Sequence, residues 1–287
     1  MRIAVLGANG QLGSDVVAEA RRRGHEVVEL TRAKLDLERL EAIPTALGAV
    51  AFEALVNATG YHRTDEAEAQ AQLAFTINAH AVERLALVCA EKKARLVHIS
   101  TDYVFDGLAD RPYREDDPPG PLNVYGASKL AGEGLARRAH ADTVVLRVAS
   151  LFGVAGSSGK GGNFVETMIR IGREKGQLKV VGDITMSPTF TADVARILLE
   201  LLEREAPPGV YHAVNSGRAT WFDFARRIVE RAGVKAVVER ISSDQYPTAA
   251  RRPAFSALDN SKAARVAGEI PPWEEALDRY LALKGYR

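Results

Sequence analysis

Two short stretches carry side chains that could deliver a proton to a carbonyl oxygen. The first is the hydroxyl pair Ser100-Thr101, and the second is the run 125–129, which begins with Tyr125 and ends with Lys129. If a helix begins there, the phenol and the amine lie at i and i+4 on one face. Free tyrosine titrates near ~10, and a nearby cation favours the phenolate, so the pair is suited to general acid catalysis. A tyrosine and a lysine four residues apart also occur on ordinary amphipathic helices, where the tyrosine packs and the lysine is solvated. The rest of the sequence must therefore distinguish a catalytic pair from such a helix.

The start of the chain has the elements of a dinucleotide site. A predicted strand over residues 3–6 leads into a turn with glycine at every third position, and a helix is predicted over 15–23. Such glycines permit a tight turn, close approach to a pyrophosphate and packing of helix on strand. The position directly after a buried strand favours cofactor binding over simple turn formation. The residues that we expect to bind the cofactor here are Gly7, Asn9, Gly10, Gln11, Leu12 and Gly13.

The second predicted strand, residues 26–30, ends without an acidic residue and is followed by Thr31 and Arg32. A carboxylate at this point would accept from the ribose hydroxyls, whereas Arg32 could pair with a 2′-phosphate. The sequence therefore favours NADPH, with NADH as the alternative, because a surface arginine can also be merely solvated. Further expected contacts to the cofactor in this region are Asp36 and Leu37.

Further strands are predicted over residues 54–57 and 95–99, separated by a polar loop over 61–66 and a helix over 69–92. Alternating strands and helices with short turns predict right-handed crossovers and a doubly wound parallel sheet. Ligands bind beyond the carboxyl ends of such strands, which places Thr101 and Tyr125 at the same edge as the glycine turn. The small residues that we expect against the cofactor after the third strand are Ala58, Thr59 and Gly60.

Composition limits the classes of partner. The 287 residues include 38 basic and 37 acidic ones, which leaves a net charge of +1 and no indication of nucleic-acid binding. The apolar run at residues 3–6 is too short for a signal peptide or a membrane span, so we expect a cytoplasmic protein without a membrane partner. The single cysteine, Cys89, is expected in the core. His62 has no second His or Cys at metal-ligand spacing, and we expect no metal site among the side chains of the chain.

Beyond residue 153 the sequence changes character. We expect a dinucleotide-binding domain over residues 1–153, completed by 191–214, and a smaller α/β substrate domain from 154–190 and 215–287. Residues 154–162 form a polar, glycine-rich run that could be a lid over the substrate or a disordered loop. Trp221 opens a predicted amphipathic helix and is expected to pack there rather than to stack on a base. The pair Arg251-Arg252 suits a diphosphate, with two solvated arginines on a surface loop as the alternative.

Several motifs together resemble known enzymes. The runs 7–13, 100–105 and 125–129 are similar to those of extended short-chain dehydrogenases/reductases. Within that superfamily the chain resembles the dTDP-4-dehydrorhamnose reductases, and this likeness covers nearly the whole chain. The runs that carry the narrower likeness are 10–13, 100–105, 121–126, 163–164, 187–189 and 252–259.

This resemblance implies hydride transfer from a nicotinamide to C4 of dTDP-4-dehydro-L-rhamnose, which gives dTDP-L-rhamnose. Tyr125 would protonate the alkoxide, Lys129 would hold the nicotinamide ribose and lower the pKa of Tyr125, and Thr101 would orient the carbonyl. The likeness also implies a nucleotide-sugar substrate and suggests a homodimer, and it leaves a need for Mg²⁺ open. The alternatives are another nucleotide-sugar epimerase or ketoreductase, or a non-catalytic subunit on the same fold. The expected substrate contacts are Thr101, Asp102, Tyr103, Leu151, Asn163 and Arg252.

Overall fold

The computed structural model describes residues 1–156 and 162–286. Its centre is a six-stranded sheet with the strand order β10-β5-β4-β3-β1-β2, and every neighbouring pair is parallel. The predicted doubly wound Rossmann-type sheet is therefore confirmed. Its strands are β1 (Arg2–Leu6), β2 (Glu26–Leu30), β3 (Ala54–Asn57), β4 (Arg95–Thr101), β5 (Thr143–Val148) and β10 (Gly209–His212).

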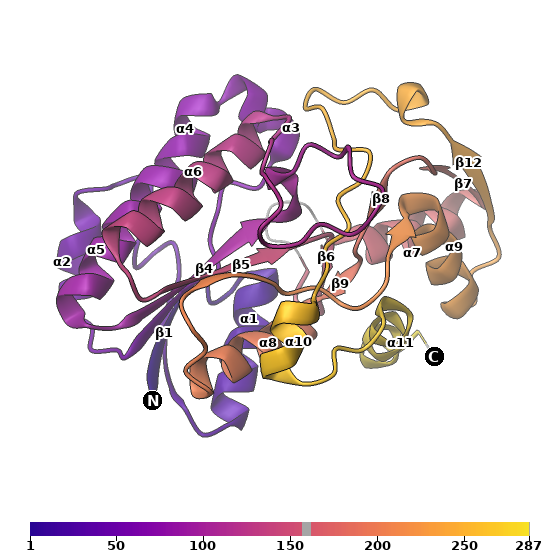
Figure 1. Cartoon of the computed structure of the whole chain (residues 1–287). Coiled ribbons are helices and arrows are strands. Elements are labelled where there is room, and N and C mark those ends of the chain that lie inside the picture. Colours follow the sequence, from indigo (N-terminus) through magenta and orange to yellow (C-terminus); the bar gives the residue numbers. More distant parts are fainter. Residues whose placement is uncertain (157–161, 287) are drawn as a thin grey trace.

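Helices cover both faces of this sheet (Figure 1). Alternate residues of β1 point to opposite sides, so Val5 joins one apolar core and Leu6 another. Because both faces are covered by helices, β1 and β3 read as nearly continuous apolar runs, which explains why the sequence predicts them to within one residue. The helices on the Val5 side are α1 (Gln11–Arg22), α8 (Thr191–Glu203) and α10 (Ser261–Ala267), and those on the Leu6 side are α2 (Ala42–Gly48), α5 (Ala81–Lys92) and α6 (Val124–Ala139).

A third apolar core lies beside the carboxyl ends of the strands, on the right of Figure 1. Phe152 stacks on Phe190 with ring centroids 5.6 Å apart, and Tyr280 meets both rings edge-on. The residue boundaries of the two predicted domains stay a prediction. The elements around this core are α7 (Phe164–Lys175), α9 (Trp221–Arg231), α11 (Trp273–Leu283), the parallel pair β7 (Gln177–Val181) and β12 (Val237–Ile241), and the short pairs β6 (Leu151–Phe152) with β9 (Thr189–Phe190) and β8 (Thr185–Met186) with β11 (Ala219–Thr220).

Two predicted segments differ from the structure. The sequence predicts a helix over residues 38–47, but α2 begins only at Ala42. The reason is that the Asp36 carboxylate and carbonyl accept from the backbone N–H groups of Glu38 and Arg39 and form a turn instead. The expected loop 61–66 is helical from its fourth residue, where α3 (Thr64–Ala69) begins with two acidic residues in its first turn.

The long helix expected over residues 69–92 is interrupted. It consists of α4 (Ala71–Phe75), the π-helical turn η1 (Thr76–His80) and α5. The stretch Ala71–Lys92 is long and apolar enough to cross a membrane by length and composition alone, yet half of the qualifying window is buried inside the protein, as in a core helix. Cys89 is fully buried there, as predicted.

Candidate active site

A cleft of about 1150 Å³ opens at the carboxyl ends of β1 to β5. All the predicted site residues line it except Gly13, which lies behind the glycine turn. The predicted residues on its surface are Gly7, Asn9, Gly10, Gln11, Leu12, Thr31, Arg32, Asp36, Leu37, Ala58, Thr59, Gly60, Thr101, Asp102, Tyr103, Tyr125, Lys129, Leu151, Asn163 and Arg252.

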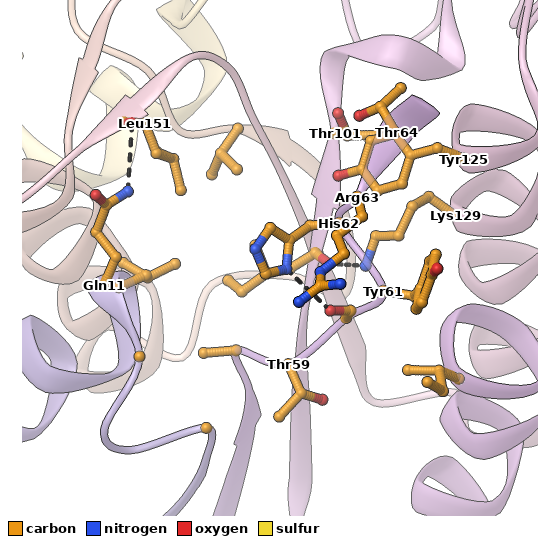
Figure 2. A pocket seen from close by; sticks show the side chains of 18 of the residues that line it. Gln11, Thr59, Tyr61, His62, Arg63, Thr64, Thr101, Tyr125, Lys129 and Leu151 are labelled. Atoms are coloured by element: carbon orange, nitrogen blue, oxygen red, sulfur yellow. Dashed lines mark hydrogen bonds between the residues drawn. The ribbon is translucent and has the colours of Figure 1, made fainter. Parts of the chain in front are cut away.

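Tyr125 is positioned by the first turn of α6. The N-cap residue Asn123 accepts a hydrogen bond from the backbone N–H of Gly126 at 2.8 Å. A Cβ atom on Gly126 would lie only 2.1 Å from the Tyr103 carbonyl oxygen, so glycine lets this turn pack directly on the segment after β4. The rings of Tyr125 and Tyr103 then meet edge-on, with centroids 6.0 Å apart. Figure 2 shows Thr101, Tyr125 and Lys129 together on one side of the cleft, opposite Gln11 and Leu151.

The electrostatics of Tyr125 and Lys129 differ from the prediction. Burial raises the pKa of Tyr125 to about 12, although a side-chain hydrogen bond with Thr101 acts in the opposite direction. Burial also lowers the pKa of Lys129 to about 8. Lys129 Nζ lies 2.5 Å from the carbonyl oxygen of Ile99 and 3.3 Å from Nε2 of His98. The expectation that Lys129 lowers the pKa of Tyr125 is therefore wrong for this state, because the amine is directed at β4 and desolvation of the phenol dominates.

The two adjacent hydroxyls of the strand β4 have different partners. Ser100 donates to Glu133 Oε1 at 2.5 Å, and Glu133 also forms two hydrogen bonds with the buried guanidinium of Arg147. Thr101 instead donates to Asp102 Oδ1 at 3.0 Å and caps the short 3-10 turn η2 (Asp102–Val104). Thr101 thus provides the hydroxyl beside Tyr125, whereas the hydroxyl of Ser100 connects β4 to α6.

The turn after β1 has the shape needed by a dinucleotide. Gly7 has φ +76°, and a Cβ atom there would lie 3.0 Å from Thr59. A Cβ atom on Gly13 would lie 2.0 Å from the Gly7 carbonyl oxygen, so this glycine is required for packing of α1 on the turn. Gly10 caps α1 without a side chain, which leaves the positive helix N-terminus open to a phosphate. Gln11 donates to the Leu151 carbonyl at 3.2 Å and joins the turn to β6.

At the far end of the cleft, Thr31 and Arg32 follow β2 as predicted. The Arg32 side chain is 74% exposed and lies 3.3 Å from Asp36, and it also forms an ion pair with Glu38. An exposed arginine of this kind can exchange a carboxylate partner for a phosphate at small cost, since surface ion pairs contribute about 0–1 kcal/mol.

The turn after β3 is fixed by Asn78, a residue the sequence interpretation did not single out as functional. Its side chain bonds to the backbone N–H of Tyr61 at 2.8 Å, to the Tyr61 carbonyl at 3.1 Å and to the Ser128 hydroxyl at 3.0 Å. Asn78 lies in the π-helical turn η1, and such turns are frequent at functional sites. It connects the segment beside Gly60 to the helix that carries Tyr125.

The other end of the cleft combines one ion pair with aromatic rings. Arg252 forms two hydrogen bonds with Asp65, at 2.8 and 2.7 Å, which orients its guanidinium at the cleft. Burial raises the pKa of Asp102 to about 6. Trp221 was expected only to pack; it packs on Phe164, but it also reaches the cleft surface.

Asn163 lines the cleft, but its side chain is already engaged. It caps α7, and its amide nitrogen lies 3.0 Å from the Gly153 carbonyl and 3.1 Å from the Tyr280 hydroxyl. The run 154–162 lies partly outside the described residues, so its alternatives of lid and loop stay open. Further cleft residues that the sequence interpretation did not assign to the site include Tyr61, His62, Arg63, Thr64, Ile77, Phe164 and Phe224.

Asp15 lies outside the cleft, on α1. It accepts a hydrogen bond from Thr191 of α8 at 2.5 Å, and burial raises its pKa. Across residues 1–156 and 162–286, no group of three or more His, Cys, Asp or Glu side chains is placed to hold a metal ion.

Comparison with known proteins identifies the family. The RmlD substrate binding domain family matches residues 1–284. The spore coat polysaccharide biosynthesis protein SpsK of Bacillus subtilis is 36% identical, with 98% of this chain and 96% of that protein covered. The dTDP-4-dehydrorhamnose reductase of Mycolicibacterium smegmatis is 37% identical over 98% of this chain and 85% of its own length.

The fold agrees with this match. A crystal structure of dTDP-4-dehydrorhamnose reductase from Bacillus anthracis in complex with NADP superposes with a TM-score of 0.92 at 33% identity, covering 98% of this chain and 99% of that one. The resemblance in the sequence motifs, the parallel sheet and the cleft at its edge all agree with these comparisons. The chain therefore belongs to the RmlD family of dTDP-4-dehydrorhamnose reductases.

Proposed function

We propose that this protein reduces the C4 keto group of dTDP-4-dehydro-L-rhamnose to a hydroxyl, giving dTDP-L-rhamnose, with NADPH as the hydride donor. The observation that carries the proposal is the meeting of Thr101, Tyr125 and Lys129 on one wall of the cleft that also holds the glycine turn. Names of relatives support the reaction, since several are dTDP-4-dehydrorhamnose reductases.

In this reaction the nicotinamide supplies the hydride to C4. Tyr125 gives its phenolic proton to the oxygen that was the ketone, and Thr101 holds that oxygen by a hydrogen bond. The chain's part is to orient the carbonyl and to provide this proton, because the cofactor carries the difficult chemistry.

The preference for NADPH rests on Arg32, which lines the cleft directly after β2. Its planar guanidinium is suited to a 2′-phosphate. We assign the pyrophosphate to the residues at the N-terminus of α1 and the nicotinamide ribose to Lys129. The nucleotide diphosphate of the sugar would lie at the opposite end, beside Arg252, whose orientation is fixed by Asp65. The enzyme is expected to act in the cytoplasm, as a homodimer.

The decisive experiment replaces the phenol. We expect Tyr125→Phe to reduce turnover of dTDP-4-dehydro-L-rhamnose by about 10²–10⁴-fold, because that is the usual contribution of a positioned general acid. NADPH consumption and sugar product should be followed together, and cofactor binding should stay near the wild-type level.

The matched control is Tyr211→Phe, which removes a hydroxyl that donates to the Pro207 carbonyl away from the cleft. It should leave turnover unchanged. Near-normal turnover in Tyr125→Phe, or a wild-type protein that does not consume NADPH with this substrate, would contradict the proposal.

A further inference from the structure

Behind Lys129 lies a buried row of polar side chains that the proposed function does not use. Asn57 of β3 and His98 of β4 are both fully buried. Asn57 Nδ2 lies 3.2 Å from Nδ1 of the His98 ring, and the other ring nitrogen, Nε2, lies 3.3 Å from Lys129 Nζ. The neighbours of this row fix which atom carries each proton.

The orientation of the Asn57 amide comes first. Its oxygen accepts from the backbone N–H of Thr59 at 3.1 Å and from the Thr59 hydroxyl at 2.5 Å. A backbone N–H can only donate, so the oxygen must face Thr59 and the NH₂ group must face His98. The NH₂ group donates to Nδ1, and this ring nitrogen therefore carries no proton.

The ring itself is uncharged. Burial lowers the pKa of His98 well below its ordinary value. A neutral imidazole has one N–H group, and with Nδ1 bare that proton must be on Nε2. The N–H group of His98 thus points at the nitrogen of Lys129.

An ammonium has three donors and no acceptor, so it cannot accept this N–H. An uncharged amine can, because its lone pair faces His98 while one of its own N–H groups donates to the Ile99 carbonyl. We propose that His98 is a positioning residue that stabilises the uncharged amine of Lys129 over the ammonium in the cofactor-free protein. The depression of the pKa of Lys129 to about 8 by burial acts in the same direction.

Two other titratable groups, Glu133 and Tyr125, lie near Lys129 on the same helix. Glu133, one turn further along α6, raises the pKa of Lys129, but its carboxylate is held by Ser100 and by Arg147 of β5. Tyr125 lies on the same helix with a pKa raised to about 12. An uncharged amine exerts no ionic effect on that phenol. Only the ammonium form of Lys129, in which the contact with the His98 N–H is given up, can favour the phenolate; this consequence for turnover rests on the proposed function.

The inference can be tested on the wild-type full chain without any activity. At a pH above about 8, where the Lys129 amine is uncharged, two-bond ¹H–¹⁵N correlation spectra of protein labelled in histidine should show His98 as the neutral tautomer with its proton on Nε2. Protein labelled with ¹³C at lysine Cε should show one lysine that titrates near 8 and is missing in Lys129→Arg. A proton on Nδ1 of His98, or titration of Lys129 at the ordinary value of about 10.4, would overturn the inference.

A variant adds a causal test. Glutamine in His98→Gln can turn its carbonyl oxygen toward Lys129 and accept from an ammonium, so we expect the Lys129 midpoint to rise by about one unit. The high-pH limb of kcat/KM should move upward with it. The control His140→Gln changes a histidine at the end of α6 that lies 3.0 Å from the Ala94 carbonyl, and it should leave both values unchanged.

A folded His98→Gln protein, judged by its melting temperature and NADPH binding, with an unchanged lysine midpoint would refute the role of His98. Because the NMR titration needs no substrate, its outcome is independent of whether the proposed reductase activity is found.

Discussion

The buried pair of Glu133 and Arg147 joins the helix of Tyr125 to the sheet, and its removal gives the most quantitative prediction. Glu133 accepts from Ser100 of β4 and from Arg147 of β5, with the closest ion-pair distance 2.7 Å. We consider Glu133→Gln, which keeps the shape of the side chain and removes its charge. The guanidinium of Arg147 then stays buried without a counterion.

The size of the effect follows from burial. Both side chains are 5% exposed, and loss of one partner of such a pair costs about 3–5 kcal/mol. Unfolding entropy is about 2.1 cal/mol/K per residue, so for 287 residues it is about 0.6 kcal/mol/K. The melting temperature should therefore fall by about 5–8 °C.

Thermal unfolding followed by circular dichroism at pH 7 measures this change. The control is Glu174→Gln, which breaks an exposed pair with Arg170 whose side chains are 53% and 61% exposed; such pairs contribute about 0–1 kcal/mol, so the shift should stay below about 2 °C. In addition, the high-pH limb of kcat/KM should move downward in Glu133→Gln, because the carboxylate raises the pKa of Lys129. If Glu133→Gln melts within the range of the control, the pair does not stabilise the fold as argued.

Two further predictions concern the cofactor and the pH dependence of stability. Arg32→Ala should raise KM for NADPH by about tenfold, because loss of an exposed charge-assisted contact costs about 1.4 kcal/mol. KM for NADH should stay unchanged, since NADH has no 2′-phosphate. Equal changes for both cofactors would contradict the assignment of Arg32. Burial lowers the pKa of His212 to about 3, whereas unfolded histidine titrates near 6.5, so its contribution to stability is present above pH 6.5 and is lost as the pH falls. Between pH 7 and pH 5 this loss is about 2 kcal/mol. The free energy of unfolding measured with urea should therefore fall between these two pH values by about 2 kcal/mol less in His212→Gln than in the wild type.

The centre of the sheet was predictable because its strands are buried on both faces. The predicted strand 54–57 agrees residue for residue with β3, whose residues are all buried, and an apolar run bounded by turns is sufficient to locate such a strand. The predicted strand 26–30 agrees equally with β2, which is partly exposed at the edge of the sheet. The start of α2 and the π-helical turn were not predictable in the same way. The first depends on the hydrogen bonds of Asp36, and the second accompanies the contacts of Asn78 with Tyr61 and Ser128, which are distant in sequence.

For the candidate site, topology was more informative than local chemistry. The rule that ligands bind beyond the carboxyl ends of parallel strands placed Thr101, Tyr125 and the glycine turn at one edge, where the structure has them. The i, i+4 spacing predicted the proximity of Tyr125 and Lys129 but not their protonation. Spacing fixes distance along a helix, whereas protonation depends on burial and on residues from other strands, such as His98, which nothing near it in the sequence indicates.

His98 and Glu133 act on the same amine with opposite effect. The carboxylate of Glu133 favours the ammonium, and the N–H group of His98 favours the uncharged form. A lysine with its ordinary pKa near 10.4 would stay charged at neutral pH whatever these neighbours did, but one with a pKa of about 8 changes its charge with a shift of about one unit. Neither residue lines the cleft. The charge of Lys129 beside Tyr125 therefore depends on His98 and Glu133, which lie behind the surface of the cleft. Substitutions of these two residues should alter the pH dependence of turnover without changing any contact to the substrate.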